Sequence, residues 1–441
     1  MKCVILMLDG LGDRPHKILK NRTPLQAART PALDRIASQS ACGIFHAGLS
    51  GEPLPSEIAH LIMFGYDRSD YPGRGYLEAL GSGISLKKNE IALLAHLAAV
   101  ENKNGILYLT DTRPDADNQT CSALMEYLNR AAQSGRDIRL EQTHKHDCIL
   151  IMKGGASRHI TDSDPIENGM PLIEVNPLDS HKKDIKARNT AKRLNKYIEE
   201  TWRLLDRHEV NVNRKKNGEP PLNCIITQRA GEPRRIDSFE SLYGMKGLVI
   251  ASGRVYKGIS RYTGMDFIKD SDTGDTEADF RRRIETALEN LNNYDFIHVH
   301  TKAPDEAAHS GNPLLKKKVI EDIDRAIAGT AAPLLENEEV VLIAAADHST
   351  PSSGTLIHSG EPVPLLMHGR TLRRDNIKKF DEISAAAGAL GQLRGKEFIL
   401  TVLNALDRAR LTGLTDHPGV PLYRPAVYKP FKTKRLRSDE K

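Results

Sequence analysis

Apolar residues gather in short runs along the chain, and several of these runs end in acidic or histidine side chains. Runs of this length, bounded by turn-forming residues, are typical of strands buried on both faces. Three of them stand out: 3–8 before Asp9, 295–300 before Asp305 and His309, and 340–346 before Asp347 and His348. Open α/β sheets keep their chemistry at the carboxyl ends of their strands, so this pattern predicts a functional site there.

Segments with apolar positions three and four residues apart separate these runs. In 315–327, Val319, Ile320, Ile323 and Ile327 share one face, which is the pattern of an amphipathic helix. Helices therefore alternate with strands, and this order predicts an α/β fold with a mostly parallel sheet covered by helices on both faces. Further helices are expected at 183–207 and 277–291, and further strands at 222–230, 247–251 and 365–367.

The pattern changes between residues 86 and 185. Strand-like runs there alternate with turns, at 92–100, 105–109 and 146–152, and one helix is expected at 118–130. This composition predicts a compact α+β insertion at 86–185. The core domain would then comprise 1–85 and 186–441.

Composition and charge narrow the class of protein. The chain has 441 residues, of which 39% are hydrophobic and 27% charged, with a net charge of +5. This ordinary balance argues against a nucleic-acid binder, and no apolar run approaches membrane-spanning length. The basic clusters 281–283, 316–318 and 429–437 are interpreted as solvated faces or loose ends.

The cysteines indicate a reducing compartment. Their number is odd, their spacing is wide and they form no Cys-x-x-Cys motif, so buried free thiols are expected. They are Cys3, Cys42, Cys121, Cys148 and Cys224. The N-terminus leads directly into a strand without a signal-peptide pattern, and cytoplasmic localisation is expected.

Acidic and histidine side chains at the strand ends form a candidate two-metal site. Asp305 and His309 are four residues apart and would share one helical face. Asp347 and His348 are adjacent, so on an extended strand they would point in opposite directions, which suits two neighbouring ions. Mixed carboxylate and imidazole ligands favour Mn²⁺ or Zn²⁺ over Mg²⁺ or Ca²⁺. The full candidate set is Asp9, Ser56, Asp305, His309, Asp347, His348 and His358.

Ser56 is either a helix N-cap or a nucleophile. A metal-bound hydroxyl would have a lowered pKa and could attack a phosphoryl group, with Arg74, Arg229 and Lys257 holding the rest of an anionic substrate. His298 and His300 alternate with apolar residues, so packing is favoured, although one of them can face the site. The remaining histidines singled out as structural are His16, His46, His60, His96, His144, His181 and His208.

Several motifs together resemble the archaeal-type cofactor-independent phosphoglycerate mutases of the alkaline phosphatase superfamily. The resemblance runs nearly end to end. It is carried by residues 8–15, 23–25, 30–34, 56–61, 64–67, 73–75, 78–81, 160–165, 223–231, 302–309, 347–351 and 358–364. Three stretches depart from the family pattern: Glu57 replaces the usual Asp, 110–117 replaces Asp-Arg-Arg-Ala-Gly-Arg, and 227–231 is shifted from the usual Thr-Arg-Gly-x-Gly.

The resemblance implies interconversion of 3-phosphoglycerate and 2-phosphoglycerate, in glycolysis or gluconeogenesis, through a phosphoserine at Ser56. It also implies that the insertion is a cap over a small anionic substrate, to which Asp111 and Arg113 would contribute. Mn²⁺ is the favoured ion, with Zn²⁺ or Mg²⁺ as alternatives. By position, one ion would be surrounded by Asp9, Ser56, Asp347 and His348, and the other by Asp305, His309 and His358.

Two other functions stay open on the sequence. The same metal centre suits a phosphatase, another phosphomutase or a homoserine-kinase-like relative acting on a different phosphorylated metabolite. A non-catalytic binding module is the third hypothesis, and the complete set of site residues argues against it. No nucleic-acid or membrane partner is expected.

Overall fold

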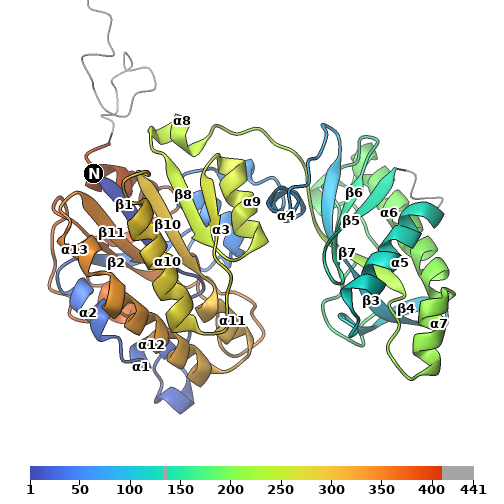
Figure 1. Ribbon diagram of the computed structural model, residues 1–441, viewed down its shortest axis with the longest axis horizontal. Coiled ribbons are helices and arrows are strands. Elements are labelled where there is room, and N and C mark those ends of the chain that lie inside the picture. The colour runs from blue at the N-terminus through green and yellow to red at the C-terminus, as the bar shows by residue number, and fades with distance from the viewer. Residues whose placement is uncertain (133–136, 410–441) are drawn as a thin grey trace, which may run out of the picture.

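The computed structural model describes residues 1–132 and 137–409. The chain forms two units, each built on its own sheet, with helix α4 (Arg74–Gly81) between them (Figure 1). We call the larger unit the core unit and the smaller one the insertion. Helix α4 contacts α9 (Arg254–Thr263) of the core unit and β3 (Ile91–Lys103) of the insertion.

The core unit is organised around an eight-stranded sheet in the order β13-β2-β12-β11-β1-β10-β8-β9. All neighbouring strands are parallel except β12, which runs antiparallel to β11 and β2. The predicted α/β fold with a mostly parallel sheet is therefore confirmed. The strands are β1 (Lys2–Leu8), β2 (Ala41–His46), β8 (Gly247–Ala251), β9 (Asp266–Lys269), β10 (Phe296–Thr301), β11 (Val340–Ala345), β12 (Val363–His368) and β13 (Gly391–Arg394).

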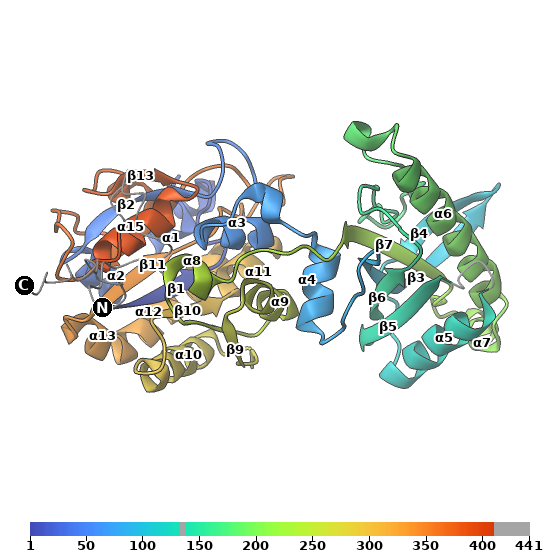
Figure 2. The same cartoon turned by 90° about the horizontal axis from the view of Figure 1, so that it is seen from above.

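Helices cover both faces of this sheet. Figure 2 shows α10 and α12 on one side and α3 and α15 on the other. Side chains alternate along each strand, so every second residue points to the same face of the sheet. Phe296 and His298 of β10 accordingly both contact Phe64 at the end of α3. The core-unit helices are α1 (Pro24–Ala27), α2 (Pro31–Ala37), α3 (Ser56–Met63), α8 (Phe239–Tyr243), α10 (Thr276–Asn290), α11 (Ala303–His309), α12 (Pro313–Thr330), α13 (Ala332–Glu336), α14 (Glu382–Ala385) and α15 (Glu397–Ala405), with short 3-10 helices Lys17–Leu19 and Arg68–Asp70.

The insertion has a five-stranded antiparallel sheet with its own hydrophobic core. The 22-residue helix α6 packs its apolar face, including Ala191, Leu194 and Ile198, into that core. Strand β7 pairs with β3 in the same sheet. Besides β3, the insertion contains β4 (Ile106–Asp111), β5 (Ile138–His144), β6 (Asp147–Met152), β7 (Cys224–Gly231), α5 (Asn118–Ala131), α6 (Ile185–Asp206), α7 (Glu209–Lys216) and the 3-10 helix Asp179–His181.

The predicted return to the core at residue 186 is therefore wrong. The insertion extends over 91–231, because α6 and β7 complete its sheet and core. A helix exposes the same amphipathic pattern whichever sheet it covers, so periodicity alone could not assign α6 to its unit.

Two basic residues lie in the interior, contrary to the expectation of solvated faces. Arg283 and Lys316 are both fully buried, and each is paired with acidic groups or carbonyls. The predicted basic segment 429–437 lies outside the described residues. All five cysteines are buried and free, as expected. Among the described residues, no helix is long and apolar enough to cross a membrane.

Candidate metal centre

The predicted ligands meet at one edge of the core sheet. Strand β1 lies between β10 and β11, so the residues that follow these three strands become neighbours. Asp9 follows β1 directly, and Asp347 and His348 follow β11. Strand β10 leads into the short helix α11, which carries Asp305 and His309.

Asp9, Asp347 and His348 form the first cluster that could hold a metal ion, and all three are buried. His348 Nε2 lies 3.2 Å from Asp347 Oδ2 and 3.5 Å from Asp9 Oδ1. The expectation that Asp347 and His348 point in opposite directions is wrong. Strand β11 ends at Ala345, so both residues lie in a bent loop to which strand alternation does not apply.

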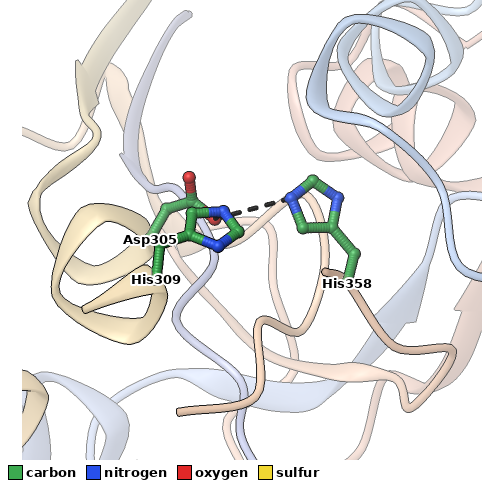
Figure 3. Close-up of side chains that lie close together, drawn as sticks. All are labelled: Asp305, His309 and His358. Carbon is green, nitrogen blue, oxygen red and sulfur yellow. Dashed lines mark ion pairs between the residues drawn. The ribbon is translucent and has the colours of Figure 1, made fainter. Parts of the chain in front are cut away.

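Asp305, His309 and His358 form the second cluster (Figure 3). His309 Nε2 lies 3.3 Å and His358 Nε2 3.6 Å from Asp305 Oδ1. His309 reaches the carboxylate from one turn further along α11, as the spacing of four predicted. His358 approaches from the loop before β12.

Ser56 lies at the first cluster and is the first residue of α3. Pro55 occupies the N-cap position and no side chain caps the helix, so the N-cap interpretation of Ser56 is wrong. Ser56 Oγ is 2.9 Å from His348 Nε2. The side chain lines a cavity of about 420 Å³ that also contains Asp305, His309 and His358. One hydroxyl therefore faces both clusters.

Buried carboxylate oxygens in these clusters fit divalent cations. Asp9 Oδ1 and Asp347 Oδ2 are buried and receive no hydrogen bond. Burial and the charge of Asp9 raise the pKa of Asp347 well above its usual range. Burial alone would also raise the pKa of Asp9, but His300 and His348 outweigh it and lower this pKa. Uncompensated buried carboxylates are costly, and a cation bound between them would offset that cost.

A second layer of side chains orients the residues of the first cluster and Ser56. Asp9 Oδ2 accepts hydrogen bonds from Tyr256 Oη at 2.5 Å and His300 Nε2 at 3.0 Å, which leaves Oδ1 free. His60 Nδ1 lies 2.8 Å from the Ser56 carbonyl oxygen and 3.5 Å from Asp347 Oδ2. His60, interpreted from the sequence as structural, therefore lies in contact with the first cluster. Alternation along β10 gave a signal for His300, whereas nothing local marked Tyr256 or His60.

Two arginines meet beside Ser56. Glu57 is 1% exposed, and its carboxylate lies 3.5 Å from Arg74 Nη1 and 3.7 Å from Arg229 Nη1. Arg74 is the first residue of α4, between the units, and Arg229 belongs to β7 of the insertion. Both also line a second cavity, of about 470 Å³, between the units. Lys302, which the sequence reasoning missed, lines the Ser56 cavity 3.5 Å from Asp305 Oδ2.

The other predicted substrate residues are dispersed. Arg113 lines the second cavity and pairs with Asp147 at 2.9 Å, while Arg254, not predicted, approaches the same carboxylate at 3.8 Å. Asp111 lines neither cavity and accepts a hydrogen bond from the Arg113 backbone. Lys257 lines a separate cavity that shares Arg254 with the second one.

The fold and the paired clusters define a metal-dependent α/β enzyme class. The family model described as the Metalloenzyme superfamily matches residues 1–405. A protein from Methanocaldococcus jannaschii, named 2,3-bisphosphoglycerate-independent phosphoglycerate mutase 2, is 39% identical over 96% of this chain and 98% of its own. A protein from Methanopyrus kandleri, named 2,3-bisphosphoglycerate-independent phosphoglycerate mutase, is 35% identical over 93% of this chain and 98% of its own. Within the superfamily, this chain belongs to the 2,3-bisphosphoglycerate-independent phosphoglycerate mutases.

Solved structures agree with this placement. The cofactor-independent phosphoglycerate mutase of Thermoplasma acidophilum is 30% identical, with a TM-score of 0.61 over 92% of this chain and 100% of its own. A protein from Pyrococcus horikoshii has a TM-score of 0.75 at 29% identity, over 93% and 99% of the two chains. The likeness covers both units of the fold.

Proposed function

We propose that this protein interconverts 3-phosphoglycerate and 2-phosphoglycerate through a phosphoserine at Ser56, with two divalent metal ions. The observation that carries the proposal is the position of Ser56 Oγ, 2.9 Å from His348 Nε2, in the cavity that contains the second cluster. A nucleophile placed there would face a phosphoryl group bound between the two clusters. The names of the Methanocaldococcus and Thermoplasma relatives support this reaction.

The donor sets suit Mn²⁺, because they mix carboxylate with imidazole. Bound divalent ions would lower the pKa of the serine hydroxyl and offset the charge of the transferring phosphoryl group. One ion would be held by Asp9, Ser56, Asp347 and His348, and the other by Asp305, His309 and His358.

The reaction would proceed in two balanced halves. In the first, the Ser56 hydroxyl would lose its proton and Oγ would bond to phosphorus, while the ester oxygen on C3 leaves and takes up a proton. In the second, the C2 hydroxyl would lose its proton and attack the same phosphorus, and the released Ser56 Oγ would take up a proton. The glycerate must stay bound between the halves, since its loss would leave only hydrolysis.

Arginines at the junction of the two cavities would retain the glycerate. Arg74 and Arg229 can pair with its carboxylate beside Ser56, because a guanidinium forms paired hydrogen bonds with such groups. Arg113 and Arg254 would bind an anionic group from the far side of the second cavity. The insertion would also exclude water from the phosphoserine, which favours transfer over hydrolysis.

The test is to incubate Mn²⁺-loaded protein with 3-phosphoglycerate and to follow both 2-phosphoglycerate and free phosphate. We expect isomer without stoichiometric phosphate release. Ser56→Ala should lose at least about 10³-fold in rate, since it removes the nucleophile. Ser38→Ala is the matched control, because its hydroxyl only bonds the Arg35 carbonyl at the end of α2. Phosphate release without isomer would favour the phosphatase alternative, and full activity of Ser56→Ala would reject the mechanism.

A further inference from the structure

A buried threonine connects the two metal clusters. Thr350 follows the Asp347–His348 loop and is fully buried. Its Oγ1 lies 2.8 Å from Asp305 Oδ1 of the second cluster and 3.1 Å from His348 Nδ1 of the first. No other hydroxyl among residues 1–132 and 137–409 has hydrogen bonds to ligands of both clusters.

The two contacts of Thr350 determine which ring nitrogen of His348 carries the proton. A threonine hydroxyl has one hydrogen, and a carboxylate can only accept it. The hydroxyl hydrogen therefore goes to Asp305, and the lone pair of Oγ1 accepts a hydrogen bond from His348 Nδ1–H. This leaves the lone pair of Nε2 free, facing Ser56 Oγ and the carboxylates of Asp9 and Asp347.

Without Thr350 the opposite tautomer would be favoured. Nε2 faces two carboxylates, which would stabilise a proton on that nitrogen, and a protonated Nε2 cannot bind a metal ion. His358 shows the simpler solution: its Nδ1 lies 2.8 Å from the Leu54 carbonyl oxygen, which can only accept. At His348 the partner of Nδ1 is a hydroxyl, which can donate or accept. It acts as an acceptor there because its hydrogen is donated to Asp305.

The backbone holds this threonine rigidly in place. Its N–H donates to the Gly12 carbonyl at 2.9 Å, and its own carbonyl accepts from Lys316 Nζ at 2.8 Å. Gly10 approaches so closely that an added Cβ would lie 2.6 Å from Thr350 Oγ1 and 2.8 Å from Asp305 Cβ. The close approach of Gly10 thus limits the space around both Thr350 Oγ1 and Asp305.

We infer that Thr350 is a positioning residue that sets His348 as the Nδ1–H tautomer and thereby prepares Nε2 to bind a metal ion. The inference rests on the proposed metal site, but not on which phosphate ester is the substrate. Partners of this kind, bonded to the outer nitrogen of a ligand histidine, are typically worth 10- to 100-fold in metal affinity.

The test needs no substrate. NMR of ¹⁵N-histidine-labelled protein, after removal of metal, shows which ring nitrogen of His348 carries the proton. The His348 signals are identified by their loss in His348→Asn. In the wild type we expect a protonated Nδ1 and an unprotonated Nε2. Thr350→Val, which keeps the shape but removes the hydroxyl, should move the proton to Nε2 and weaken Mn²⁺ binding 10- to 100-fold in a chelator competition. Thr350→Ser should restore both to near wild-type values.

Thr330→Val is the matched control, since this buried hydroxyl only bonds the Ala326 carbonyl within α12. It should leave the tautomer and the Mn²⁺ affinity unchanged. A proton on Nε2 in the wild type would overturn the inference, even if Thr350→Val failed to fold. So would a Thr350→Val variant that matches Thr330→Val in both measurements. A missing mutase activity with the expected tautomer would reject the proposed function alone.

Discussion

Replacing Lys316 by Met should destabilise the core unit far more than replacing its neighbour Lys317. The Lys316 ammonium is fully buried and lies 3.2 Å from Asp13 Oδ2, which is equally buried. It also donates to the carbonyls of Gly12 and Thr350, at 2.8 Å each. One side chain therefore joins α12 to the two loops that lead from Asp9 and His348.

The size of the expected loss in unfolding free energy follows from the burial of Lys316. Removing one partner of a buried ion pair typically costs 3–5 kcal/mol, because the remaining charge is left without compensation. The buried Thr350 carbonyl would also lose its hydrogen bond, whereas the Gly12 carbonyl keeps the one from the Thr350 N–H. Asp13 keeps hydrogen bonds from Ser352, which limits the loss. We therefore expect the free energy of unfolding to fall by about 4 kcal/mol. Lys317 pairs with Glu321 at the surface, 29% exposed, and Lys317→Met should cost about 0.5 kcal/mol.

Denaturant unfolding of the full chain measures this difference in two signals. Trp202 is the only tryptophan and packs against the insertion core, so its fluorescence reports the insertion. Far-UV circular dichroism reports both units. Lys316→Met should shift the dichroism transition and leave the fluorescence transition closer to that of the wild type. In a double-mutant cycle with Asp13→Asn, the two losses should be non-additive by about 1 kcal/mol or more.

Equal destabilisation by Lys316→Met and Lys317→Met would refute this reasoning. Additive losses in the cycle would do the same for the ion pair, and would leave the carbonyl hydrogen bonds as the main contribution of Lys316.

Two further predictions concern the arginine pair and the pH dependence of stability. Glu57→Gln should raise the KM for 3-phosphoglycerate by about 10-fold, because Arg74 and Arg229 would be held less firmly in place, which corresponds to about 1.4 kcal/mol. Glu57→Asp should be milder. An unchanged KM would contradict this prediction, and a lower KM would show that Glu57 competes with the substrate for the arginines. Burial, with the charge of Arg113, lowers the pKa of His96 from 6.5 to about 4. The unfolded chain binds the proton more readily than the folded one. His96 therefore does not reduce the free energy of unfolding above pH 6.5, but it reduces it by about 3 kcal/mol in all as the pH falls towards 4. His96→Gln should therefore flatten the acid side of the stability curve, measured by urea unfolding; an unaltered slope would contradict this.

Most of the candidate metal ligands could be predicted because they follow a strong local pattern. Asp9 and Asp347 close apolar runs, and the spacing between Asp305 and His309 is that of one helical turn. A parallel sheet brings the carboxyl ends of its strands to one edge, so local patterns were sufficient to bring these residues together. The prediction that the side chains of Asp347 and His348 point in opposite directions was wrong, because the strand ends two residues before Asp347.

The extent of the insertion could not be predicted in the same way. Helix α6 and strand β7 have patterns that fit either sheet, and only pairing with β3 assigns β7 to the insertion. Buried Arg283 and Lys316 were also missed, because a basic residue is buried only when distant parts of the chain supply its partners.

By itself, the sequence determined the order of strands and helices, the types of the candidate ligands and the candidate nucleophile, since these depend on residues close together in the chain. The tertiary structure alone decided which oxygen of Asp9 stays free, which nitrogen of His348 faces Ser56, and which arginines converge on Glu57. These properties depend on hydrogen bonds and ion pairs between segments hundreds of residues apart, such as Tyr256 with Asp9. Hydrophobic periodicity records which face of an element is buried, but not which polar atom it meets there.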